Sequence, residues 1–210
     1  MESQIIEFTD CQKIQAMSIK SLFIVSLFLT FNTMATPLFE EHAPMEEPDD
    51  VWTVHAEKYD DDIEMIALVN GKIVHGDKFR IRILADRCHV GNTVTSFLTE
   101  MDHPEIEQQE GRVISAMFRG IEIKVQILFA LDNPGFMGHM VYLDLGWLGL
   151  ESIKTFFDGY DEMSLELIDN DDFKASDYFD ITKNTWSTTR LNEALDLAEM
   201  KCKEFVNENH

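Results

Sequence analysis

The sequence predicts an α+β fold, mainly antiparallel β, built as a sandwich or a partly open barrel with one short internal helix and a C-terminal amphipathic helix. Apolar and polar residues alternate over much of 51–210, which is typical of half-buried strands. Turn residues separate these short segments, which favours antiparallel neighbours. Near the C-terminus, apolar residues recur instead at three- and four-residue intervals, which indicates a helix.

The first predicted hairpin joins residues 63–69 to 72–74 through Asn70-Gly71. Both central residues of a two-residue hairpin turn take positive φ, and Asn and Gly tolerate this best. The same alternation or β-branched content predicts further strands at 79–83, 93–99, 139–145 and 163–168.

A second hairpin is predicted around Arg119-Gly120, between residues 113–118 and 121–129. Because side chains of a strand alternate between two faces, every second residue of its later strand is expected on one apolar face. These residues are Ile121, Ile123, Val125, Ile127 and Phe129.

Two helices complete the prediction. Leu150, Ile153 and Phe157 are spaced as on one helix face, and Asp158-Gly159 is expected to end this helix. The C-terminal helix presents a longer apolar stripe toward the core. Its members are Leu191, Ala194, Leu195, Ala198, Cys202 and Phe205.

The N-terminal segment predicts export. Residues 17–35 start at Met17, carry Lys20, continue through an apolar run and end in a small-x-small pattern, which is typical of a signal peptide cut between Ala35 and Thr36. The run is too short to span a bilayer as a stable helix. Residues 1–16 are acidic, so we interpret them as a non-native extension; the alternative is a short anchor helix.

Residues 36–50 are predicted to be a linker, because they combine three prolines with repeated Asp and Glu and hold few apolar side chains. Residues 51–210 are then expected to form a single globular domain. After processing, the chain is expected to have no stable membrane anchor and to be periplasmic or secreted.

The formal charge is −22, from 39 acidic and 17 basic residues. Residues 1–35 hold three acids and two bases, so the processed chain would carry −21. Nucleic acids and anionic membranes are bound mainly through Lys and Arg, so this charge disfavours both. It favours a cationic partner such as a basic protein; the alternative is adaptation to a salty or crowded exterior.

Cysteine use agrees with export. Of three cysteines, Cys88 and Cys202 remain after processing, and an oxidising compartment is expected to join them in a disulfide. The alternative is two separate buried thiols.

Motifs for common catalytic classes are absent from the sequence: H-E-x-x-H, C-x-x-C, G-x-S-x-G, a Walker loop and G-x-G-x-x-G. We therefore predict no catalytic residues, no cofactor and no metal ligands. The histidines are scattered, with no pair at metal-ligand spacing on one element. The aspartates of 169–180 are interpreted as a solvated turn, with calcium binding as the alternative.

Aromatic residues alternate with acids between Tyr178 and Trp186, so Tyr178, Phe179 and Trp186 are the predicted partner surface. The competing interpretation is that Trp147 and Trp186 close the ends of the core.

Together these features favour an exported, acidic, non-catalytic binding or inhibitor-type module. One alternative is a secreted or periplasmic hydrolase using carboxylates, with or without a supporting calcium ion. The other is a structural subunit of an envelope assembly.

Overall fold

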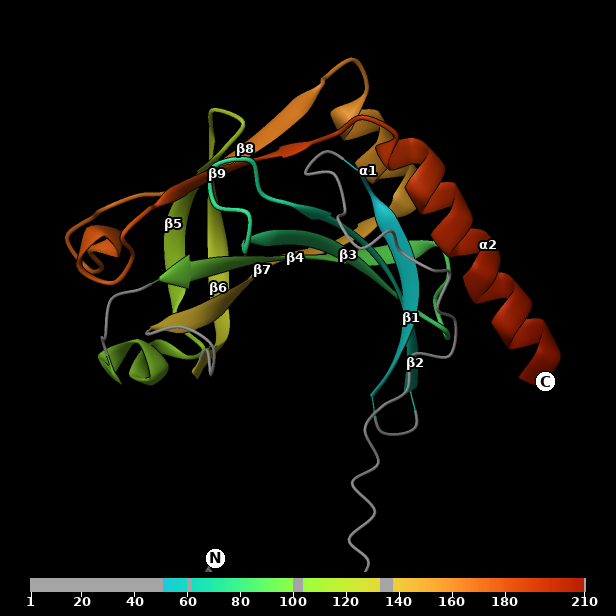
Figure 1. The fold of residues 1–210 in the computed structure, drawn as a ribbon, viewed down its shortest axis with the longest axis horizontal. Coiled ribbons are helices and arrows are strands. Elements are labelled where there is room, and N and C mark those ends of the chain that lie inside the picture. The colour runs from blue at the N-terminus through green and yellow to red at the C-terminus, as the bar shows by residue number, and fades with distance from the viewer. Residues whose placement is uncertain (1–50, 60–61, 100–103, 133–137, 210) are drawn as a thin grey trace, which may run out of the picture. The chain divides into compact units, whose positions relative to one another are not determined.

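The computed structural model describes residues 51–209, except 60–61, 100–103 and 133–137. The expected extension 1–16, signal peptide 17–35 and linker 36–50 lie outside the described residues, and so does the cleavage site at Ala35 and Thr36. The described residues form nine strands, two α-helices and two 3₁₀ helices (Figure 1). The elements are β1 Thr53–Tyr59, β2 Asp62–Asn70, β3 Lys78–Leu84, β4 Val90–Thr99, η1 Pro104–Gln109, β5 Val113–Phe118, β6 Ile121–Asp132, β7 His139–Gly149, α1 Leu150–Phe157, β8 Glu162–Leu167, η2 Ala175–Asp177, β9 Lys183–Ser187 and α2 Leu191–Asn209.

All nine described strands belong to one antiparallel sheet in the order β1-β2-β3-β4-β7-β6-β5-β8-β9. The sheet curves until its two edges approach: the indole Nε1 of Trp52, just before β1, donates to the carbonyl of Ser187 at the end of β9 at 2.9 Å. The edge strands do not pair, so the sheet is not closed. This confirms the predicted mainly antiparallel fold, in its partly open barrel form rather than as a two-sheet sandwich.

The concave face of the sheet holds the core, and both α-helices add to it. Phe79, Phe97 and Trp186 are fully buried at its centre, with ring centroids of Trp186 5.5 Å from Phe79 and 6.1 Å from Phe97. Burying one large apolar side chain contributes about 2 kcal/mol. The α2 stripe predicted from the sequence is confirmed, and α2 lies against β1, β2 and β3 (Figure 1).

One predicted strand face is wrong because β6 contains a β-bulge at Leu128. Ile127 pairs with Leu143, but Phe129 pairs with Tyr142, so one extra residue lies in β6 between these pairs. A bulge reverses which residues face the core. Phe129 therefore leaves the apolar face that Ile127 belongs to and contacts Tyr142, with ring centroids 4.6 Å apart.

The two predicted hairpins differ in outcome. Arg119 and Gly120 have φ of 51° and 78°, which confirms the two-residue turn between β5 and β6. The other prediction is wrong: β2 ends at Asn70 and β3 begins at Lys78, so residues 72–74 belong to a longer connection. The amide N–H of Gly71 donates to the carbonyl of Asp77 at 2.7 Å and closes this connection.

Candidate functional site

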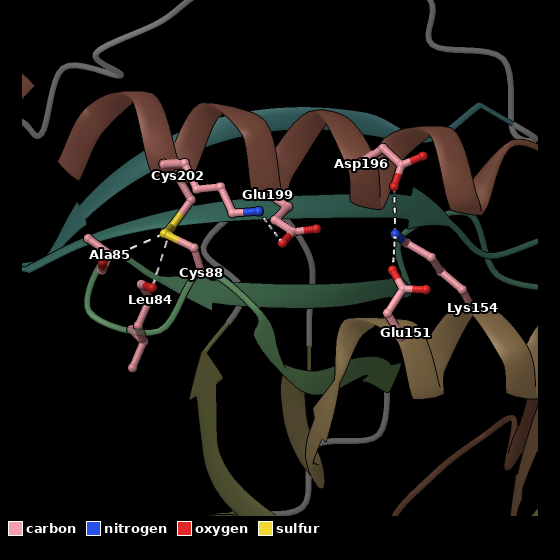
Figure 2. Close-up of polar contacts among 9 residues, drawn as sticks. Leu84, Ala85, Cys88, Glu151, Lys154, Asp196, Glu199 and Cys202 are labelled. Carbon is pink, nitrogen blue, oxygen red and sulfur yellow. Dashed lines mark hydrogen bonds and ion pairs between the residues drawn. A yellow bond between two sulfur atoms is a disulfide. The ribbon is translucent and has the colours of Figure 1, made fainter. Parts of the chain in front are cut away.

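Cys88 and Cys202 lie at disulfide distance, with their sulfurs 2.06 Å apart (Figure 2). Cys88 lies between β3 and β4, and Cys202 is fully buried on the core side of α2. The pair expected from the sequence therefore fastens α2 to the sheet. A buried cysteine pair at this distance agrees with an oxidising, exported environment.

A second link joins α2 to α1. The ammonium of Lys154 on α1 donates to Asp196 of α2 at 2.5 Å and to Glu151 at 2.7 Å (Figure 2). Burial lowers the pKa of Lys154, but the hydrogen bonds to Asp196 and Glu151 outweigh it and leave the pKa above its ordinary value. This ion pair and the disulfide hold α2 at two points along its length.

Two of the three residues of the predicted partner surface are in the core, so that prediction is wrong for them. Trp186 is 0% exposed and Phe179 is 2% exposed, and both pack against Phe97. Trp186 lies on β9, a strand that the sequence analysis did not identify. Its burial agrees with the competing interpretation of a tryptophan that closes the core. Tyr178 is half-buried and stacks on Phe173, with ring centroids 5.2 Å apart.

Trp147, the other tryptophan considered for closing the core, is exposed instead of buried. Its side chain is 45% exposed near the end of β7, with the guanidinium of Arg87 4.8 Å from the ring centroid. It does not close the core, because Leu145 is an extra residue in β7 between the pairs Val94–Asp144 and Thr93–Gly146, and this irregularity turns Trp147 away from the face that holds Val141 and Leu143.

We call residues 168–182, between β8 and β9, the acidic connection. It contains the aspartates of 169–180 that the sequence analysis interpreted as a solvated turn. Its exposed carboxylates are Asp169, Asp171, Asp172, Asp177 and Asp180. It extends to the left of the sheet in Figure 1.

The backbone of the acidic connection is held in place from both sides. Phe173 and Ala175 are buried in the core. On the outer side, Asn170 Oδ1 accepts the amide N–H groups of Asp172 and Phe173, each at 2.9 Å. Asp169 accepts from the amide and the hydroxyl of Ser176 at 3.0 and 2.7 Å, and these bonds hold the pKa of Asp169 below its usual value. The aspartates are therefore displayed on an ordered frame.

The calcium alternative for this segment gains no support. Among the described residues, the acidic connection brings no three carboxylate, imidazole or thiolate donors within 4.8 Å of one another. Calcium takes six to eight oxygen ligands, so a site would need a closer gathering of these side chains.

Elsewhere in the described residues, three side chains with possible metal-ligand atoms do come together. The ligand atoms of Glu107, Asp132 and His139 lie within 4.8 Å of one another. They come from η1, the last residue of β6 and the first residue of β7. His139 is buried, whereas Glu107 and Asp132 are exposed. Sequence spacing could not reveal this group, since each ligand lies on a different element.

A buried polar network lies near the approaching sheet edges. Asp77 accepts the amide N–H of Leu98 at 2.6 Å and the side-chain amide of Asn184 at 2.7 Å. Burial raises the pKa of Asp77 from 3.8 to about 6, against the opposing effect of these two hydrogen bonds. Asn184 Oδ1 also accepts from the amide of Ile73, so the network fastens residues 71–77 to β9. Because Asp77 and Asn184 are both buried, we interpret this network as stabilising the fold and not as a binding site.

Comparisons with protein-family models, with curated proteins and with solved structures found no match to this chain. Neither α-helix of the described part is long and apolar enough to cross a bilayer. A function must therefore be assigned from the residues themselves.

Proposed function

We propose that this chain is an exported, non-catalytic binding or inhibitor-type module whose acidic connection contacts a cationic partner. The observation that carries this proposal is the display of five exposed aspartates on a connection whose backbone is fixed by buried side chains. A surface that is already ordered loses little conformational freedom when it binds.

The distribution of cationic groups supports the same proposal. Several lysines and arginines elsewhere in the described part pair with nearby carboxylates, as in Lys72 with Glu162, Arg82 with Glu64 and Lys183 with Glu166. Other arginines stack on aromatic rings, as Arg80 does on Tyr142 at 5.1 Å from the ring centroid. Pairing of this kind leaves the acidic excess of −22 to set the field around the molecule.

The direct test measures binding of an oligolysine peptide to a variant of the connection that lacks three of its five aspartates, Asp171→Asn/Asp172→Asn/Asp177→Asn. The matched control, Asp158→Asn/Glu204→Gln/Glu208→Gln, removes the same charge from exposed positions on and after the two helices. Exposed ion pairs contribute about 0.5 kcal/mol each, so the first variant is expected to weaken binding about tenfold. Equal weakening by both variants would show that only the overall charge matters and that the connection is not the site.

A further inference from the structure

We propose that Glu107, Asp132 and His139 form a binding site for a divalent transition-metal ion, for which Zn²⁺ is the probe. The donor atoms of all three side chains lie within 4.8 Å of one another. This proposal goes beyond the function above, because it concerns different residues and binding of a metal ion rather than of a cationic partner.

The fold positions the two strand residues opposite each other. Asp132 and His139 are direct partners in the antiparallel ladder of β6 and β7, so their side chains lie on the same face of the sheet. The β-bulge at Leu128 is what places Asp132 there, since without the extra residue it would face the other side. Bulges commonly re-aim side chains at functional sites.

The third ligand is held by η1. Ile106 is fully buried and anchors this short helix, which leaves its neighbour Glu107 at the surface. The carboxylate of Glu110, just after η1, accepts the amide N–H of Ala130 on β6 at 3.3 Å. Glu107 is thus kept beside the end of β6 by contacts that do not use its own carboxylate.

The buried imidazole ring of His139 independently supports a metal site. The side chain is 5% exposed, yet neither ring nitrogen forms a hydrogen bond with any described residue. Its Nδ1 lies 3.2 Å from a carboxylate oxygen of Asp132, a distance that suits an ion pair but without the direction of a hydrogen bond. Leaving a buried polar group unpaired is unfavourable, which calls for a further partner.

His139 Nδ1 and the carboxylate oxygen of Asp132 are close together but do not form a hydrogen bond. Two ligands of one metal ion are arranged in this way. With bonds of about 2.1 Å, neighbouring ligands stand about 3.0 Å apart on an octahedral ion and about 3.4 Å apart on a tetrahedral ion. The 3.2 Å between His139 Nδ1 and Asp132 Oδ1 falls between these values. Asp132 is 83% exposed and Glu107 is also exposed, so their carboxylates can rotate to complete the site.

The donor set selects the class of metal. One imidazole with two carboxylates suits Zn²⁺ and related ions, whereas Ca²⁺ and Mg²⁺ prefer sites made of oxygen alone. Three protein ligands leave one tetrahedral position open for water or for a group from a bound molecule. The two carboxylates neutralise the ion.

The test titrates ZnCl₂ into the full, metal-stripped chain by calorimetry, with CaCl₂ and MgCl₂ as competitors. We expect one tight site that Ca²⁺ and Mg²⁺ do not fill at the same concentration. Asp132→Asn and Glu107→Gln should each weaken it at least tenfold. Glu105→Gln, on the same 3₁₀ helix, removes the same charge without removing a ligand, and its affinity should stay within twofold of the wild type.

Visible absorption of bound Co²⁺ gives a second readout, because an ordered low-coordinate site produces an intense band that diffuse binding to carboxylates does not. That band should be lost in His139→Gln; since His139 is buried, the two exposed carboxylate variants keep the test decisive if this variant fails to fold. Absence of a single Zn²⁺ site, or equal weakening by Glu105→Gln and Asp132→Asn, overturns the proposal.

Discussion

Asp77 and Asn184 are 107 residues apart in the chain, yet the side-chain amide of Asn184 donates to the carboxylate of Asp77 at 2.7 Å in the buried interior. Asn184 is the central member of this contact, since it also donates to the carbonyl of Val74 at 3.0 Å. The contact joins the connection after β2 to the edge strand β9, across the opening of the barrel. The stability of the barrel is therefore tied to the protonation of one carboxyl group.

Asp77 makes the free energy of unfolding depend on pH. Its pKa is raised from 3.8 to about 6 in the folded chain, so between these values the folded state binds more protons than the unfolded state. The contribution of this group to stability must then fall by about 3 kcal/mol in total as pH rises from below 3.8 to above 6, with about 2 kcal/mol of this between pH 4 and pH 6, and level off above.

Urea unfolding at pH 4 and pH 7 measures this dependence against Asp77→Asn, which cannot titrate. The wild type should exceed the variant by more at pH 4 than at pH 7. Asp171→Asn, an exposed aspartate, should leave the wild-type pH dependence in place. A constant difference between wild type and Asp77→Asn at both pH values would contradict the assignment.

Gly71→Ala should destabilise the chain through the same network. A Cβ at this position would lie 2.3 Å from Nδ2 of Asn184 and 2.5 Å from the carbonyl oxygen of Val74. Overpacking of this kind costs about 1–3 kcal/mol. In the control Gly76→Ala, the new Cβ meets only the end of Leu98 at 3.3 Å, so thermal unfolding should separate the two variants. Equal melting temperatures would mean that the close approach of residue 71 to Asn184 is wrong.

Reduction of the Cys88–Cys202 pair should lower stability, because the bond closes a segment of 114 residues and restricts the unfolded chain. The chain-entropy model gives about 4–5 kcal/mol, and measured values are often smaller. The readout is urea unfolding with and without reductant, and Cys88→Ser/Cys202→Ala should match the reduced protein and show no response to reductant. Identical unfolding of oxidised and reduced wild type would contradict a structural role for this pair.

Truncating the two tryptophans to alanine should lower the free energy of unfolding by very different amounts. Trp186→Ala removes a fully buried ring from the centre of the core and should cost about 3–5 kcal/mol. Trp147→Ala removes a 45% exposed ring and should cost less than about 1 kcal/mol. Chemical denaturation of both variants decides this, and a larger loss for Trp147→Ala would reverse the placement of the two rings.

The sequence was informative wherever a feature depends on neighbours along the chain. The turn at Arg119-Gly120 needs two residues that tolerate positive φ, and α2 needs one apolar stripe; both follow from local spacing. The Cys88–Cys202 pair was open to prediction because those are the two cysteines that remain after the expected processing.

Features that depend on distant partners could not be predicted. The alternation of β6 ends at Leu128, but the apolar residues that follow fit either face of the strand, so the sequence alone does not show the bulge that decides the direction of Phe129 and Asp132. Asn70-Gly71 has the composition of a tight turn, but contacts of residues 71–77 with Asn184 hold a longer connection. The burial of Trp186 could not be predicted from its neighbours along the chain, because the rings it packs against, Phe79 and Phe97, come from strands far away in sequence.

The most direct test of the central claim is the association rate constant of oligolysine with the full chain, measured by stopped flow across a salt series. Steering by the acidic excess predicts a rate constant that falls steeply from low to physiological ionic strength, with a smaller fall for Asp171→Asn/Asp172→Asn/Asp177→Asn. A rate constant that does not change with salt, or the same salt dependence in that variant and in wild type, would contradict a cation-binding role for the acidic connection.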